Sequence, residues 1–168
     1  MLPITLSPYV LKAGLAGTGD ARDRRAALLA EAGVEARLLP ADAPDEVLAG
    51  LQLLFVAGLA EGEARALATR ARALGVLVNV EDVLALCDFH VPAIVRRGDL
   101  LLTASTGGQV PGLSRALRES LAAQFGPEWN DRLRELSRAR ARWRSEGLTP
   151  AEVSHMVRAH VAREGWLA

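Results

Sequence analysis

A glycine-rich turn ahead of a helical segment is the first place in the sequence where chemistry can be expected. Residues 14–33 read GLAGTGDARDRRAALLAEAG, and Gly17 and Gly19 flank Thr18 just before the helical periodicity begins. Two glycines let a chain turn tightly and approach a pyrophosphate, and the following helix start offers unpaired N–H groups and a partial positive charge. The turn is therefore typical of a dinucleotide site.

The same turn departs from the usual pattern at its third position. Arg22 stands where a small residue usually lets helix and strand pack closely, so its side chain must point outward or displace the helix. A Gly-x-Gly turn by itself is equally consistent with a plain structural turn, and both interpretations stay open on the motif. The cofactor contacts that the first interpretation predicts are Gly17, Thr18, Gly19, Asp20 and Ala21.

An acidic residue beyond the second strand usually binds the cofactor ribose. Asp42 follows the segment VEARLL, residues 34–39, and is the candidate for this contact. A solvent-facing turn residue is the alternative interpretation. Asp20, at the helix start, suits the helix dipole but puts negative charge near any bound phosphate.

Short apolar runs alternate with helix-period segments through the first two-thirds of the chain. LQLLFVAG, residues 51–58, is apolar without alternation, as in a parallel strand that is covered on both faces. Strands are expected at residues 10–16, 34–39, 51–58 and 76–80, and helices at 20–32, 45–48 and 61–74. This order predicts an α/β fold with a Rossmann-type, doubly wound parallel sheet.

The pattern changes after residue 88. Residues 89–105 indicate two strands with no room for a crossover helix, so we expect a hairpin on the sheet edge or an arm that pairs with another subunit. Only helices are expected after residue 112, and Thr149 opens one of them with a capping box. We therefore predict a Rossmann-like domain with an edge hairpin at 1–112 and a helical dimerisation or substrate domain at 113–168.

The composition of the chain limits the kinds of protein it can be. The chain has 168 residues, half of them apolar, and a formal net charge of zero, so a globular fold is expected and a nucleic-acid partner is not. A single cysteine, Cys87, allows no internal disulfide and favours a reducing, cytoplasmic setting. The segment MLPITLSPYV does not read as a signal peptide, and no membrane span is expected.

A series of short motifs runs through residues 77–121. They are Asn79-Val80-Glu81-Asp82, Cys87-Asp88-Phe89, Pro92 to Val95, Arg96 to Leu100, Ser105-Thr106-Gly107-Gly108 and Leu113 to Glu119. The series strongly resembles the N-terminal module of siroheme synthases and the stand-alone precorrin-2 dehydrogenases, some of which are also sirohydrochlorin ferrochelatases. The family's glycine loop, usually G-G-G-x-V-A-x-R-K, maps without a gap onto residues 17–25. The chain departs from the family at Arg22, in its Ala-Gly-Leu-Ala first strand, and at Val83, where a second Asp is frequent.

The resemblance implies oxidation of precorrin-2, a polycarboxylated tetrapyrrole, to sirohydrochlorin with NAD as the hydride acceptor. In bifunctional members insertion of Fe²⁺, as a substrate, follows. Asp82 matches the family's key aspartate, and a carboxylate at a strand end can accept protons there. The alternative for Asp82 is a turn or helix-capping role.

Candidate contacts to the substrate carboxylates lie after residue 95. The expected contacts are the loop residues Ser105, Thr106, Gly107 and Gly108, and the arginines Arg96, Arg115 and Arg118. The guanidinium fork matches a carboxylate, and a solvated surface charge is the alternative interpretation for each arginine. The Arg-rich segment 132–144 is expected to be a solvated helix face, and the few His and Cys residues lack the spacing of a metal site.

Apolar stripes on the helices after residue 112 require a partner, so a homodimer is expected. The rival hypothesis is a non-catalytic or chelatase-only relative that binds a tetrapyrrole but carries a degenerate NAD loop. A different NAD-linked dehydrogenase would fit the sheet but not the motifs of 77–121.

Overall fold

The computed structural model describes residues 1–167, which fold into two compact units divided between Val91 and Pro92. The division differs from the predicted boundary near residue 112. The two hairpin strands form a sheet of their own and group with the helices that follow, so the hairpin is not hydrogen-bonded to the edge of the parallel sheet. Within residues 1–167, no helix has both the length and the apolar character needed to cross a membrane.

The first unit alternates strands and helices as predicted. Its elements are η1 (Pro8–Val10), β1 (Ala13–Gly17), α1 (Gly19–Glu31), β2 (Arg37–Leu39), α2 (Asp45–Leu48), β3 (Leu53–Ala57), α3 (Glu61–Ala73), β4 (Leu77–Val80) and η2 (Leu84–Leu86). The strands pair in parallel in the order β2-β1-β3-β4. This is the predicted Rossmann-type fold, and its strand order reverses between β1 and β3.

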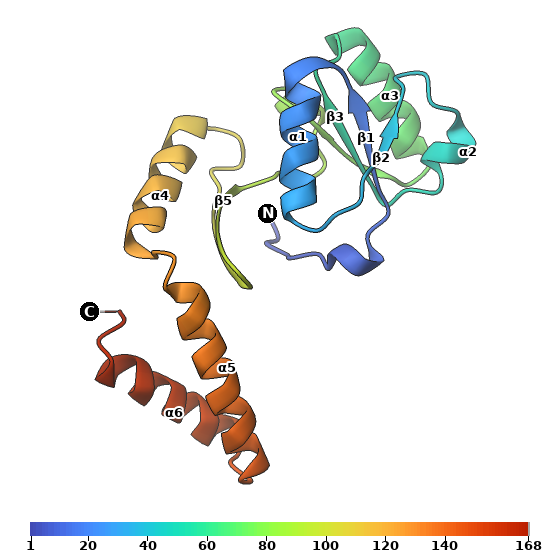
Figure 1. Ribbon diagram of the computed structural model, residues 1–168. Coiled ribbons are helices and arrows are strands. Elements are labelled where there is room, and N and C mark those ends of the chain that lie inside the picture. The colour runs from blue at the N-terminus through green and yellow to red at the C-terminus, as the bar shows by residue number, and fades with distance from the viewer. Residues whose placement is uncertain (168) are drawn as a thin grey trace. The chain divides into compact units, whose positions relative to one another are not determined.

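Helices cover both faces of this sheet (Figure 1). On one face α1 packs over Leu15 and Phe55, and on the other α3 packs over Val56 and Val78. All five residues of β3 are buried, which confirms the expectation drawn from its unbroken apolar run. Burial on both faces is the arrangement that parallel sheets require.

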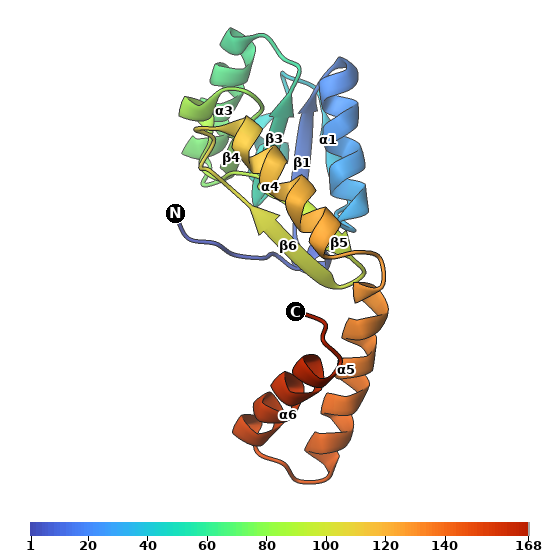
Figure 2. The same cartoon turned by 90° about the vertical axis from the view of Figure 1, so that its left-hand side faces the viewer.

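The second unit begins with the antiparallel hairpin of β5 (Ala93–Arg97) and β6 (Leu100–Ala104). Three helices follow, namely α4 (Pro111–Gln124), α5 (Trp129–Ser145) and α6 (Pro150–Arg163). Figure 2 shows α4 lying along the hairpin strands, which it contacts. Arg97 joins them, because its guanidinium donates to the carbonyl oxygens of Phe125 at 2.8 Å and Ala122 at 3.2 Å.

The capping box at the start of α6 is confirmed. The Glu152 N–H donates to Thr149 Oγ1 at 3.3 Å, and the Thr149 N–H donates back to Glu152 Oε2 at 2.8 Å. These reciprocal bonds satisfy two backbone N–H groups that a helix start otherwise leaves unpaired. They determine where the chain turns from α5 into α6.

We expect Thr149→Ala to lower the free energy of unfolding by about 1 kcal/mol, because the helix loses its side-chain acceptor. Thr149→Ser keeps the hydroxyl and is the matched control, with unfolding in urea as the measurement.

Hydrogen bonds from Thr149 lower the pKa of Glu152. The stabilisation from this carboxylate is therefore present above its ordinary pKa and is lost as the pH falls. The difference between the two variants should narrow in acid, and the part that comes from the hydroxyl accepting from the Glu152 N–H should remain. Equal stability at neutral pH would contradict the prediction.

Candidate functional site

The glycine turn lies at the carboxyl end of β1, where α1 begins. A Cβ on Gly17, whose φ is +151°, would lie 1.8 Å from the Ala57 carbonyl oxygen. Only glycine therefore allows the ends of β1 and β3 to approach this closely. Gly19 has a φ of +62°, which disfavours other residues, and a Cβ there would meet no atom within 4 Å. One glycine is thus required by a close contact, and the other adjoins open space.

The first turn of α1 has no side-chain cap. Thr18 stands at the capping position, but its hydroxyl donates to the Gly58 carbonyl oxygen at 2.8 Å instead of accepting from the helix. The first N–H groups of a helix have no partner within the helix, and they carry its partial positive charge. An uncapped helix start beside the open space at Gly19 fits a bound phosphate.

Gly58, directly after β3, allows the close approach to the start of α1 for which the glycine turn lacks its third glycine. Its φ is +73°, and a Cβ on it would lie 2.2 Å from the Thr18 carbonyl oxygen and 3.4 Å from the Ala21 Cβ. Sequence reasoning missed this residue, although a glycine that ends an apolar strand was the available signal. Arg22 points outward to Asp23, with Nη2 2.7 Å from Oδ1, and so does not displace the helix.

The predicted residues of the first unit share one edge of the sheet. Gly17 pairs with Ala57, and the Glu81 N–H donates to the Val56 carbonyl oxygen at 2.9 Å, so three strands end in one row. Adjacent strands are about 4.8 Å apart, which puts the ends of β1 and β4 roughly 10 Å apart, and Asp82 lies two residues beyond the end of β4. Asp42 is exposed just beyond β2 at the same edge. Ligands bind at this edge of open α/β sheets, next to the point where strand order reverses.

Asp82 has an unusual backbone conformation. Its φ is +63°, and it is the one non-glycine residue with positive φ within residues 1–167. It lies in a tight turn that the Val83 N–H closes onto the Val80 carbonyl oxygen at 3.3 Å, and its side chain is exposed. Such conformations cost free energy and cluster at functional sites.

The segment after Asp82 is tied back to β4. The Asn79 side-chain amide donates to the Phe89 carbonyl oxygen at 2.9 Å, and Asp88 accepts from the Val78 N–H at 2.8 Å. Partial burial opposes ionisation of Asp88, but hydrogen bonds from Arg72 and Val78 lower its pKa overall. These contacts fix both ends of the loop that carries the aspartate.

A partly buried ion pair lies on the α1 side of this edge. Arg25 Nη2 is 3.9 Å from Glu81 Oε1, with the two side chains 12% and 23% exposed, and the guanidinium lies 5.6 Å from the Phe55 ring centroid. Arg25 Nη1 and Glu81 Oε2 are buried without a hydrogen-bond partner in the described chain. Desolvation lowers the pKa of Arg25, and the negative charges of Glu81 and Asp82 oppose this shift. Neither member of the pair was predicted as a site residue.

The remaining predicted residues lie in the second unit. Gly107 and Gly108 have φ values of +64° and +79° in the loop before α4, and the loop's hydroxyls hold it together. Ser105 Oγ accepts from the Gly107 N–H at 3.2 Å, and Thr106 Oγ1 accepts from the Val110 N–H at 3.1 Å.

The three predicted arginines of this unit differ in their surroundings. Arg115 and Arg118 lie on α4, and each is 3.5 Å from Glu119. Arg96 lies on β5, and its Nε is buried without a hydrogen-bond partner within residues 1–167. The loop precedes α4, and Arg115 and Arg118 lie on that helix. Arg96 belongs to the hairpin.

The family model described as "Putative NAD(P)-binding" matches residues 11–93, which include the glycine turn and Asp82. The siroheme synthase of Pseudomonas paraeruginosa is 30% identical over an alignment covering 93% of this chain and 40% of the relative. The siroheme synthase of Methylococcus capsulatus is 33% identical over 70% of this chain and 29% of the relative. The chain belongs to the precorrin-2 dehydrogenase family.

The fold agrees with a solved member of the precorrin-2 dehydrogenase family. The structure of "SirC, precorrin-2 dehydrogenase" matches with a TM-score of 0.75 and 17% identity, and the match covers 100% of this chain and 93% of that one. At this identity the likeness establishes the fold alone. The chain spans 29% to 40% of the length of the two siroheme synthases, so only part of those proteins is compared.

We expect Asp82→Gly to raise the free energy of unfolding by about 0.5–1 kcal/mol, because glycine relieves the strain of a positive φ at some entropic cost. Asp82→Ala is the matched control: it removes the carboxylate but keeps the strain, so it should give no gain. Urea unfolding of the three proteins measures the difference. A loss of stability in the glycine variant would mean that the turn is not strained.

Proposed function

We propose that this chain oxidises precorrin-2 to sirohydrochlorin in siroheme biosynthesis, with NAD as the hydride acceptor. One observation carries the proposal. An open glycine turn and an exposed carboxylate held at positive φ, Asp82, end strands at the same edge of a Rossmann sheet in a member of the precorrin-2 dehydrogenase family.

The residues present fit a dinucleotide. The uncapped start of α1 beside Gly19 would hold the pyrophosphate through backbone N–H groups, and Asp42 would accept hydrogen bonds from the ribose. A carboxylate at that position favours NAD over NADP, because it repels a 2′-phosphate. When bound, the cofactor supplies the hydride acceptor.

Asp82 is proposed as the general base. Loss of a hydride from the substrate leaves a proton to be removed, and an exposed carboxylate without an ion-pair partner in the described chain can accept it. The same group can take up the pyrrole protons released when Fe²⁺ enters the product, so iron insertion is the second activity to be tested. The rival hypothesis of a degenerate loop is weakened by the outward direction of Arg22.

Contacts to the substrate carboxylates are proposed from the second unit. Arg115 and Arg118 are exposed on α4, and the loop of residues 105–108 precedes them. Guanidinium groups can bind carboxylates with two parallel hydrogen bonds, which orients a polycarboxylate. Arg96 is the third proposed contact.

A homodimer is also proposed. The hairpin is a two-stranded sheet, which is rarely stable alone, and α4 has no fully buried residue. Leu113 and Leu117 on α4 are 49% and 43% exposed. A second copy that covers α4 and the hairpin strands would bury this apolar surface in a symmetric contact.

The first experiment is calorimetric titration of the purified protein with NAD⁺. We expect binding that Gly19→Asp abolishes, because the new carboxylate would occupy the phosphate position and repel it. Gly62→Asp, at another open glycine in the first turn of α3, is the matched control and should bind as the wild type does. Absence of binding up to several millimolar NAD⁺, with or without tetrapyrrole, would refute the dehydrogenase proposal.

The second experiment follows NADH formation from precorrin-2. Asp82→Asn should keep NAD⁺ binding but lose about 10²–10⁴-fold in turnover, since the amide cannot accept the proton. Turnover close to that of the wild type would exclude Asp82 as the base and leave the cofactor site untouched.

A further inference from the structure

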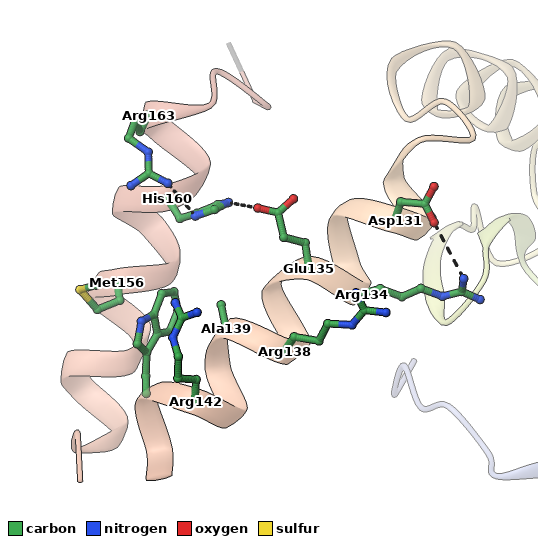
Figure 3. Close-up of a pocket in the computed structure, with 10 residues that line it drawn as sticks. Asp131, Arg134, Glu135, Arg138, Ala139, Arg142, Met156, His160 and Arg163 are labelled. Carbon is green, nitrogen blue, oxygen red and sulfur yellow. Dashed lines mark hydrogen bonds and ion pairs between the residues drawn. The ribbon is translucent and has the colours of Figure 1, made fainter. Parts of the chain in front are cut away.

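The groove between α5 and α6 gathers charged side chains that contact one another (Figure 3). Glu135 Oε1 lies 2.9 Å from His160 Nε2, and Arg163 Nη2 lies 3.0 Å from His160 Nδ1. The first contact joins the two helices, so the packing of α5 against α6 accounts for this cluster. The thiol of Cys87 has neighbours of a different kind, because it contacts the turn that carries Asp82.

The sulfur atom of Cys87 lies against both ends of that turn. Cys87 Sγ is 3.1 Å from the Val80 carbonyl oxygen and 3.5 Å from the Val83 carbonyl oxygen. Val80 and Val83 are the first and last residues of the turn, which the Val83 N–H closes onto the Val80 carbonyl oxygen. Asp82, with its φ of +63°, is the third residue. One side chain thus contacts the two backbone groups between which the proposed base is held.

The turn needs such support because its conformation is not the one that aspartate prefers. A positive φ at the third residue is typical of a type II turn, where glycine or asparagine is usual. A type I turn has a negative φ at the third residue and would relieve the strain on Asp82. Strained residues persist only where the surrounding structure determines their conformation. A contact that fixes both ends of the turn is a constraint of this kind.

Cys87 is itself held in place from several sides. Asn79, which is only 6% exposed, donates from its side-chain amide to Cys87 Sγ at 3.5 Å. The Cys87 N–H donates to the Leu84 carbonyl oxygen at 3.1 Å. On either side of Cys87 in the chain, Leu86 is buried in the core and Asp88 is hydrogen-bonded to β4. The sulfur is therefore a fixed support beneath the turn.

We propose that Cys87, held by Asn79, is a positioning residue for Asp82, an inference that rests on the proposed function. A thiol is a weak hydrogen-bond donor, so its loss should have little effect on the stability of the whole chain. A catalytic group that moves by about 1 Å, in contrast, can lose about 10²-fold in rate. The contribution of Cys87 should therefore appear in turnover and in the local order of the turn.

The first test measures NADH formation from precorrin-2 by the full chain. Cys87→Ala should lower kcat about tenfold, with the KM for NAD⁺ unchanged, because the glycine turn is not altered. Cys87→Ser should restore part of the rate, since its hydroxyl can still donate to the Val80 carbonyl oxygen. Leu84→Ala, at a side chain 49% exposed in η2, is the matched control and should keep the kcat of the wild type.

The second test does not depend on turnover. Amide hydrogen exchange, followed by NMR, should show the Val83 N–H exchanging about tenfold faster in Cys87→Ala than in the wild type. The Glu81 N–H, which is bonded to the Val56 carbonyl oxygen of β3, should exchange at the same rate in both proteins. Cys87→Val, which keeps an apolar side chain without the thiol, replaces Cys87→Ala where circular dichroism shows the alanine variant to be unfolded.

An unchanged kcat in Cys87→Ala would overturn the proposal, whatever the exchange rate of Val83, because the thiol would then support the fold alone. A wild-type protein that forms no NADH would refute the proposed function instead. The exchange of the Val83 N–H would then decide the role of Cys87: faster exchange in the variant supports the thiol as the support of the turn, and equal exchange overturns it.

Discussion

The arrangement at the carboxyl edge of the parallel sheet depends on the contact between the ends of β1 and β3. A side chain on Gly17 would collide with the Ala57 carbonyl oxygen, and one on Gly58 would collide with the Thr18 carbonyl oxygen. Both obstacles are backbone atoms, so they cannot move aside unless the strands separate. The contact also receives the Thr18 hydroxyl, which leaves the start of α1 uncapped. One packing constraint thus creates the backbone geometry that an anion requires.

Two strands farther along the edge, the chain holds a carboxylate in a conformation that is locally unfavourable. The turn at Asp82 persists because the segment behind it is anchored, by Asn79 to the Phe89 carbonyl oxygen and by Asp88 to β4 and Arg72. Ordered neighbours of this kind can maintain a strained residue whose cost is about 1–3 kcal/mol. The rigid turn keeps the carboxylate at the edge of the sheet instead of folding it back onto the protein.

Features that depend on neighbouring residues in sequence were predictable. The apolar run of β3, the periodicity of α3 and the capping box at Thr149 each specify local structure, and all are present. Features that depend on strand register or on the choice of pairing partner were not. Gly58 meets Thr18 only because β3 pairs with β1 in one register. The residues of the hairpin do not specify whether it joins the parallel sheet or forms a sheet of its own, as it does.

Arg25 and Glu81 show how the chain accommodates a charged residue at a position where the family pattern has valine. The family's N-V-V-D has valine where this chain has Glu81, and a lone buried carboxylate there would cost several kcal/mol. Arg25, over Phe55, supplies the compensating charge, and its removal alone would leave Glu81 uncompensated at a cost of about 3 kcal/mol. The family's glycine loop already has a basic residue, lysine, at the position of Arg25, so the ion pair arises from the change at Glu81 alone.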